Sequence, residues 1–147
     1  MTDEEQIGGK DKAIVEAFLD KPLLARIATA DPDTCQPHVV PVWYGWDGES
    51  IWISSYSTTR KVVELKNNPF CSIVIDVAEG DGDITALLFE GKAELVTGPS
   101  DYLREKITWV YSRYLGEEGV LADDPQEWLA SPENLLIKLT PTKTFAW

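Results

Sequence analysis

The chain has 147 residues, a length typical of one domain, and its hydrophobic fraction of 44% is that of an ordinary globular protein. Its formal net charge of −12 at pH 7 opposes association with nucleic acid or with an anionic membrane surface. An anionic ligand would therefore need a local cluster of positive charge, so clustered basic residues are the first candidates for a binding site.

The cysteines and the N-terminus carry information about the cellular compartment. Cys35 and Cys71 lie far apart and match no metal-binding spacing. Residues 1–5 are acidic, whereas a secretory signal would be basic and then apolar. No apolar run approaches the ~20 residues that span a bilayer. We therefore expect a reducing, cytoplasmic location, no metal site and no membrane partner.

The first part of the chain predicts one helix followed by short strands. Apolar residues with helical spacing predict a helix over 10–20, which Pro22 ends. Asp47-Gly48 is a strong hairpin signal between two of the strands that follow. These strands are predicted at 23–29, 38–44 and 51–55.

The second part predicts two more helices within a further set of strands. A short helix fits 60–67, and a longer one begins at Pro99-Ser100 and ends near Gly116. A helical turn is expected around 127–129. The strands are predicted at 70–77, 84–96, 135–139 and 142–147, with a loop at 79–83. Six or so antiparallel strands with added helices indicate an α+β fold built on a small β-barrel, as one domain over 1–147.

Several common catalytic motifs are missing from the sequence. Gly80-Asp81-Gly82 is the nearest approach to a dinucleotide-binding loop, but Thr85 stands where the third glycine belongs. There is no phosphate-binding loop of the Gly-x-x-x-x-Gly-Lys type. His38 is the only histidine, and its place at the start of an apolar strand favours a structural role. Hydrolysis by a Ser-His-Asp triad is therefore unsupported.

One segment has the residues of a possible anion-binding site. Arg60-Lys61 opens the predicted 60–67 helix, and the hydroxyl residues Ser55 and Thr59 precede it. A helix N-terminus binds anions through free N–H groups and a partial positive charge. Basic residues are unfavourable at that end of a helix unless an anion compensates them, so the pattern predicts a phosphate site. The residues alone leave this open against a helix start that is merely solvated.

Residues 51–72 resemble the pyridoxamine 5′-phosphate oxidase-like superfamily, the FMN-binding split barrels. In that family a strand runs into Ser/Thr-Arg-Lys, a short helix, Asn-Pro and a further strand. The matching positions here are Thr59-Arg60-Lys61, Asn68-Pro69 and 70–77. The resemblance extends upstream to 37–43 and downstream to 89–95, so it covers roughly residues 13 to 97.

The resemblance implies a split barrel, a homodimer, and a flavin bound at the dimer interface. It implies that Arg60 and Lys61 hold the FMN phosphate, and that the ring lies against the 40–42 strand, largely on its backbone. Pro41 agrees with this independently, because a proline within a strand belongs at an edge or a bulge. The implied cofactor-binding residues are Val40, Pro41, Val42, Ser54, Ser55, Thr59, Arg60 and Lys61.

The sequence also departs from the true pyridoxamine phosphate oxidases. The C-terminal segment 140–147 lacks the Arg-x-His element that helps hold their substrate, and Ala86 replaces a flavin-contacting glutamine. Vitamin B6 oxidation is therefore not expected. Other members of the superfamily bind a deazaflavin or haem. Holding the anionic tail of a deazaflavin would require further basic residues, and only Lys66 and Arg104 are candidates. A haem would have His38 as its only possible histidine ligand.

The sequence thus predicts an FMN-dependent oxidoreductase that transfers hydride through flavin N5 to an unidentified small molecule, with NAD(P)H or another donor as reductant. No catalytic side chain stands out. The alternatives are a deazaflavin-dependent reductase and a non-catalytic flavin- or haem-binding carrier or sensor. A nucleic-acid-binding barrel is a weaker alternative, because it would need a basic groove that the charge of the chain opposes.

Overall fold

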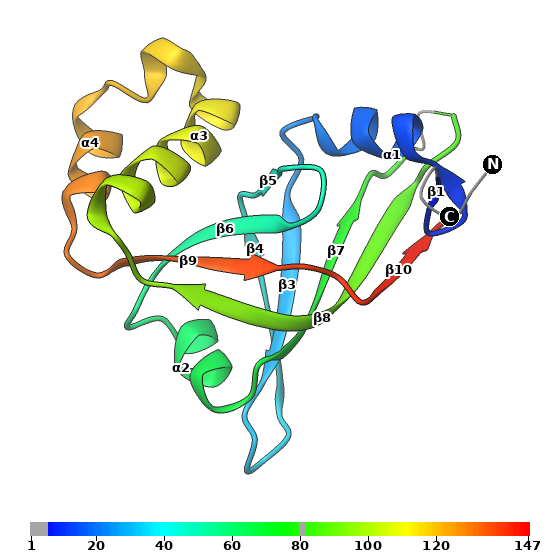
Figure 1. Ribbon diagram of the computed structural model, residues 1–147, viewed down its shortest axis with the longest axis horizontal. Coiled ribbons are helices and arrows are strands. Elements are labelled where there is room, and N and C mark those ends of the chain that lie inside the picture. Colours follow the sequence, from blue (N-terminus) through cyan, green and yellow to red (C-terminus); the bar gives the residue numbers. More distant parts are fainter. Residues whose placement is uncertain (1–5, 80–81) are drawn as a thin grey trace.

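The computed structural model describes residues 6–79 and 82–147, in which one antiparallel sheet curls into a split barrel (Figure 1). The strands run in the order β4-β3-β7-β8-β9-β6-β5, and β10 also pairs with β8. This confirms the α+β split barrel. The strands are β3 (Ala25–Ala30), β4 (Pro37–Val42), β5 (Gly45–Trp46), β6 (Ile51–Tyr56), β7 (Phe70–Asp76), β8 (Ala86–Val96), β9 (Asn134–Leu139) and β10 (Lys143–Ala146).

The barrel interior is filled by alternate residues of its strands. On β7, Cys71, Ile73 and Ile75 are buried, as the alternation of the sequence predicts. Ile27 and Phe89 face the same core from the two neighbouring strands, where each pairs with Ile73. The opposite face of these three strands is turned outward, so the sheet has one buried and one outer side.

Four helices, counted over the described residues, lie around the barrel. They are α1 (Lys12–Leu19), α2 (Arg60–Asn67), α3 (Ser100–Gly119) and α4 (Asp123–Ala130). The predicted apolar side of α3 is buried at Leu103, Ile107, Val110 and Tyr111. Gly116 is not helical (φ 81°), so the regular helix breaks where the sequence predicts its end. No helix among the described residues is long and apolar enough to cross a membrane.

Helices α3 and α4 form an excursion from the sheet. β8 and β9 are hydrogen-bonded antiparallel neighbours, and residues 97–133 between them carry both helices. In Figure 1 the two helices lie together at the left, and α2 lies at the lower edge of the barrel. A second apolar cluster, which includes Trp52 and Leu136 of the sheet, joins them to β6 and β9.

The structure adds details that local pattern did not predict. A two-stranded ribbon, β1 (Gln6–Ile7) and β2 (Lys10–Asp11), precedes α1, so the predicted 10–20 helix starts two residues late. The predicted 38–44 strand ends at Val42, because Tyr44 turns inward and its hydroxyl donates to the carbonyl oxygens of Leu19 and Lys21. Gly80 and Asp81 of the predicted 79–83 loop lie outside the described residues.

Candidate functional site

Two adjoining cavities open between the barrel and the α3–α4 excursion. The first, of about 330 Å³, is termed the polar cavity and the second, of about 370 Å³, the aromatic cavity. Both are lined by Ser54, Tyr111 and Trp128, which form their common wall. The polar cavity adds Ser55, Tyr56, Thr59 and Lys61, whereas the aromatic cavity adds Leu24, Pro41, Val42 and Trp43.

The polar cavity lies where β6 ends and α2 begins. Thr59 occupies the N-cap position of α2, but its side chain makes no capping hydrogen bond. Its hydroxyl instead lies 3.0 Å from Ser55 Oγ and donates to the carbonyl oxygen of Tyr56. The first amides of α2 therefore have no side-chain cap, and they keep the hydrogen-bonding capacity and partial positive charge that suit an anion.

Lys61 brings a full positive charge to the polar cavity. It is half-buried, and that burial lowers the pKa of its ammonium group. Within residues 6–79 and 82–147 it forms no ion pair with a carboxylate. Burying a charged ammonium without a counter-ion costs free energy, and an anionic ligand bound beside Lys61 would offset that cost.

Arg60 is placed differently from its neighbour. Its side chain is 54% exposed, lines neither cavity, and has its Nε 3.4 Å from Glu64 Oε2 within the same helix. Of the two basic residues that open the predicted helix, Lys61 thus lines the polar cavity, whereas Arg60 lies outside it and contacts Glu64. The spacing of Arg60 and Glu64, four residues apart, is the sequence signal that would have predicted this pair.

The predicted ring-binding segment lies on the last strand of the sheet. β4 pairs only with β3 among the described strands, so Pro41 is on an edge strand as its chemistry requires. Pro41 and Val42 line the aromatic cavity together with Trp43. The side chain of Val40 packs against the barrel core instead and lines neither cavity.

Tyr111 and Trp128 are site residues that sequence reasoning missed. The Tyr111 ring lies edge-on to Trp43 at 5.9 Å and edge-on to Trp128 at 5.8 Å between centroids, so two indoles hold it. Its hydroxyl is 3.4 Å from Ser54 Oγ. Burial raises the pKa of Tyr111, so the hydroxyl stays protonated at neutral pH and can donate a hydrogen bond to a ligand.

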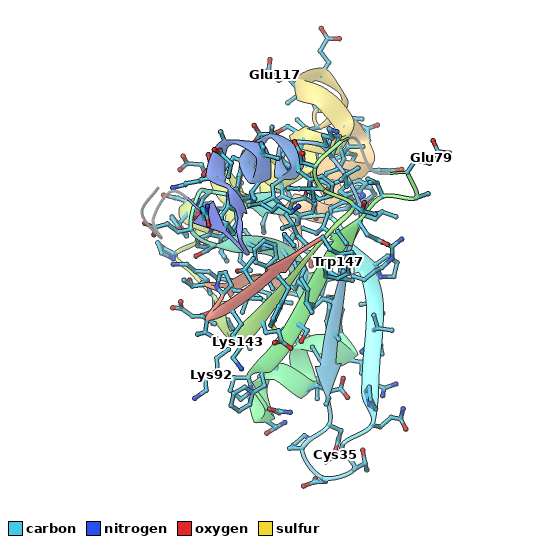
Figure 2. All side chains as sticks on the ribbon, turned by 90° about the vertical axis from the view of Figure 1, so that its right-hand side faces the viewer. Cys35, Glu79, Lys92, Glu117, Lys143 and Trp147 are labelled. Atoms are coloured by element: carbon cyan, nitrogen blue, oxygen red, sulfur yellow. The ribbon has the colours of Figure 1, made fainter. Side chains whose placement is uncertain are left out.

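The remaining candidates fall outside the two cavities. His38 lies beside Glu64, with Nδ1 3.4 Å from Oε1. The described residues contain no group of His, Cys, Asp or Glu side chains that could hold a metal ion. A larger cavity of about 780 Å³ lies on the outer side of β3, β7 and β8. Lys92 and Lys143 line it, on the side of the molecule that faces the viewer in Figure 2. None of the predicted cofactor residues lines it, so its size does not make it the candidate site.

Comparison with known proteins identifies the family and supports the fold. A sequence model described as "Pyridoxamine 5′-phosphate oxidase" matches residues 12–147. No curated protein matches the chain. Among solved structures, the conserved hypothetical protein Rv2991 from Mycobacterium tuberculosis is 27% identical with a TM-score of 0.75, over 94% of this chain and 84% of that one.

Two further solved structures are similar to this chain. An F420 reductase is 25% identical with a TM-score of 0.68, over 88% of this chain and 94% of that one. HutZ, the haem storage protein from Vibrio cholerae, is 20% identical with a TM-score of 0.71, over 91% of this chain and 92% of that one. The likeness to HutZ shows the common fold alone.

Proposed function

Since the chain belongs to the pyridoxamine 5′-phosphate oxidase family, we propose that it is an FMN-dependent oxidoreductase acting on a small molecule. Bound FMN supplies hydride transfer through its N5, and the protein supplies binding, orientation and electrostatics. The observation that carries the proposal is the polar cavity, in which the half-buried, unpaired Lys61 lies beside the uncapped start of α2.

The polar cavity suits the phosphate end of FMN. Lys61 offers a point charge, Ser55 and Thr59 offer hydroxyls, and the first turn of α2 offers backbone amides. Arg60 begins the same turn, and its Nη1 and Nη2 form no hydrogen bond with another described residue. In this assignment Arg60 adds a bidentate contact to the phosphate from outside the cavity wall.

The aromatic cavity suits the ring end. Pro41 and Val42 present an edge strand to a flat heterocycle, and Trp43, Tyr111 and Trp128 provide aromatic surface. Ser54 and Tyr111 belong to both cavities, so they would lie beside the part of the ligand that joins ring and phosphate. A small acceptor and a donor such as NAD(P)H would reach the ring from its open side.

The proposed assembly is a homodimer that packs through the outer face of the sheet. Val39, Phe70 and Phe145 are exposed on this face, at 64%, 62% and 47%. The strand register places them on one side of the sheet. Directly paired residues face the same side, and the pairing runs from Val39 through Ala28, Ser72 and Glu90 to Lys143. Phe70 and Phe145 are each two residues from a member of this row, so they face the same side as Val39. An exposed apolar face of this kind is typical of a protein–protein interface.

A deazaflavin is the second candidate cofactor. The similarity to an F420 reductase, at 25% identity over most of both chains, favours it, since F420 is a phosphate-bearing deazaflavin. The basic residues that its tail would need are not grouped: Lys66 is exposed on α2, and Arg104 donates to Gln126 on another surface. A haem carrier has no comparable support, because His38, its only histidine ligand, lies beside Glu64 and lines neither cavity.

The direct test is titration of the purified chain with FMN and with F420, followed by anaerobic addition of NADH, NADPH or reduced F420. We expect FMN to bind with a shift of its visible absorption and then to be bleached by a reductant. If the chain binds F420 in preference to FMN, the cofactor in the proposed function becomes the deazaflavin. The two are distinguished by their spectra, because the visible band of F420 lies at shorter wavelength. If neither compound binds, the proposed function fails. If FMN binds but no reductant bleaches it, the chain is a carrier.

A further inference from the structure

Glu64 is a buried carboxylate that the proposed function leaves unexplained. Its side chain is 6% exposed, although carboxylates are rarely buried unless they are paired and hydrogen-bonded. Three groups from three different elements surround it: Thr29 of β3, His38 of β4 and Arg60 of α2. Glu64 therefore connects the helix that begins at the polar cavity with the strand that carries Pro41 and Val42.

The two carboxylate oxygens face different partners. Oε1 accepts a hydrogen bond of 2.8 Å from the Thr29 hydroxyl and lies 3.4 Å from His38 Nδ1. Thr29 and His38 are directly paired across β3 and β4, so the hairpin fixes both partners together. Oε2 lies 3.4 Å from Arg60 Nε. One oxygen is thus held by the barrel and the other meets the first residue of α2.

The stability of α2 does not account for the Arg60–Glu64 pair. A basic residue in the first turn lies at the unfavourable end of the helix dipole. The order with the basic residue N-terminal to the acidic one is also the weaker order for a pair four residues apart. The Arg60 side of the pair is 54% exposed, so solvent screening reduces what the pair contributes to stability. The pair is better explained by what it does to the Arg60 side chain.

We propose that Glu64 is a positioning residue that holds Arg60 by its Nε and so presents the Nη1–Nη2 edge of the guanidinium to the phosphate of the cofactor. This inference rests on the proposed function and assigns a role within the same site. The Nε contact restrains a long, flexible side chain in advance, which reduces the entropy lost when the phosphate is bound. Because the Thr29 hydroxyl of the barrel is hydrogen-bonded to Glu64, the barrel fixes the carboxylate that Arg60 contacts.

The test compares FMN with riboflavin, which has the same ring and ribityl chain but no phosphate. Dissociation constants of both ligands are measured for the wild type, Glu64→Gln, Arg60→Ala and the double variant. We expect Glu64→Gln to weaken FMN roughly tenfold, the size of one charge-assisted hydrogen bond, and to leave riboflavin unchanged. Arg60→Ala should have a similar effect, and adding Glu64→Gln to it should cause no further loss.

Asp31→Asn is the matched control for the removal of one negative charge near Arg60, because Asp31 lies in the β3–β4 turn and interacts with Arg60 only through space. It should leave both dissociation constants unchanged. If Glu64→Gln does not fold, Glu64→Asp serves in its place, because the shortened carboxylate keeps its charge but withdraws from Arg60. Glu64→Asp should likewise weaken the binding of FMN and leave the binding of riboflavin unchanged.

Three results would overturn the inference. Equal weakening of FMN and riboflavin would make Glu64 a purely structural residue. Tighter FMN binding in Glu64→Gln would mean that Glu64 only screens the positive charge. A further loss in the double variant would mean that Glu64 does not act through Arg60. Failure of the wild type to bind FMN would instead refute the proposed function and this inference with it, so the two failures are distinguishable.

Discussion

Trp43 lies stacked on Tyr114, with their ring centroids 4.7 Å apart and their planes within 6° of parallel. Tyr114 is itself fixed, since its hydroxyl donates to the carbonyl oxygen of Leu23 and accepts from the amide of Tyr44. Trp43 thus lines the aromatic cavity with its ring already restrained by stacking on Tyr114. A ring held in this way can stack on a ligand without losing side-chain freedom on binding.

Tyr111→Phe should weaken FMN binding by about five- to tenfold, because it removes one hydrogen-bond donor from the wall of both cavities and keeps the ring between its two indoles. Titration with FMN checks this, with Tyr102→Phe as control, since Tyr102 packs against Trp52 and lines neither cavity. Because burial raises the pKa of Tyr111 above its ordinary value of 10.0, ionisation of Tyr111 should not alter the wild-type affinity below that pH. Equal losses in the two variants would contradict this role.

Lys61→Met should make the apo protein more stable to heat by a few degrees and abolish tight FMN binding. Burial lowers the pKa of Lys61, so the folded state disfavours its charged form. That penalty is present at neutral pH and disappears as pH rises through the lowered pKa toward 10.5. The stability difference between variant and wild type should therefore shrink at high pH.

Thermal melts at neutral and alkaline pH, together with FMN titrations, measure both parts of the Lys61 prediction. Lys66→Met is the matched control, because Lys66 is exposed near the end of the same helix and lines neither cavity. It should change neither the melting temperature nor the affinity. A Lys61→Met protein that melts earlier than the wild type would show that Lys61 has a stabilising partner.

Gly45→Ala should destabilise the fold by about 1–3 kcal/mol, the usual cost of overpacking. A Cβ atom at this position would lie no more than 2.9 Å from three ring atoms of Trp109, so the Trp109 ring or helix α3, which carries it, would have to shift. Urea unfolding measures the loss. In a Trp109→Leu background the same substitution should cost much less, since the obstructing ring is gone. An equal cost in both backgrounds would contradict the steric explanation.

Asp47→Asn should cost about 1–2 kcal/mol at neutral pH, because the Asp47 carboxylate accepts hydrogen bonds from the Trp52 indole and from the amides of Glu49 and Ser50. Burial raises the pKa of Asp47, but these hydrogen bonds outweigh it and leave the pKa below 3.8. Their stabilisation is therefore present above the unfolded value of 3.8 and lost as pH falls through the lower folded value.

Urea unfolding of the wild type and Asp47→Asn at neutral pH and at about pH 2 tests the sign of this effect. The two proteins should differ at neutral pH and converge in acid. A difference that stays constant would mean that the charge of Asp47 is not what stabilises the turn. Asp83→Asn, at an exposed loop position, provides the comparison.

Much of the fold was predictable because its signals are local. The alternation of Cys71, Ile73 and Ile75 and the helical spacing of Leu103 and Ile107 both report which side of an element is buried. The two-residue strands β1, β2 and β5 were missed because they are too short to show a period and form only through pairing with a partner strand.

Local sequence predicted the part of the candidate site whose residues lie close together along the chain. Ser54, Ser55, Thr59 and Lys61 come from one strand–turn–helix segment, and the structure brings them to one cavity. Tyr111 has the spacing of a core residue, and nothing local indicates that its hydroxyl reaches Ser54, 57 residues earlier. That contact depends on how α3 docks on β6, which is a property of the whole chain.

The excursion between β8 and β9 has a consequence for how such a protein can diversify. Two adjacent antiparallel strands need only a tight turn, yet here the connection carries the residues that close both cavities, Tyr111 and Trp128. Mutations, insertions and deletions within it can reshape the wall of both cavities while the N-terminal end of α2 stays as it is. Because Tyr111 and Trp128 line both cavities, a change in this one stretch of the gene alters the polar and the aromatic cavity together, whereas a change in residues 55–61 alters the polar cavity alone.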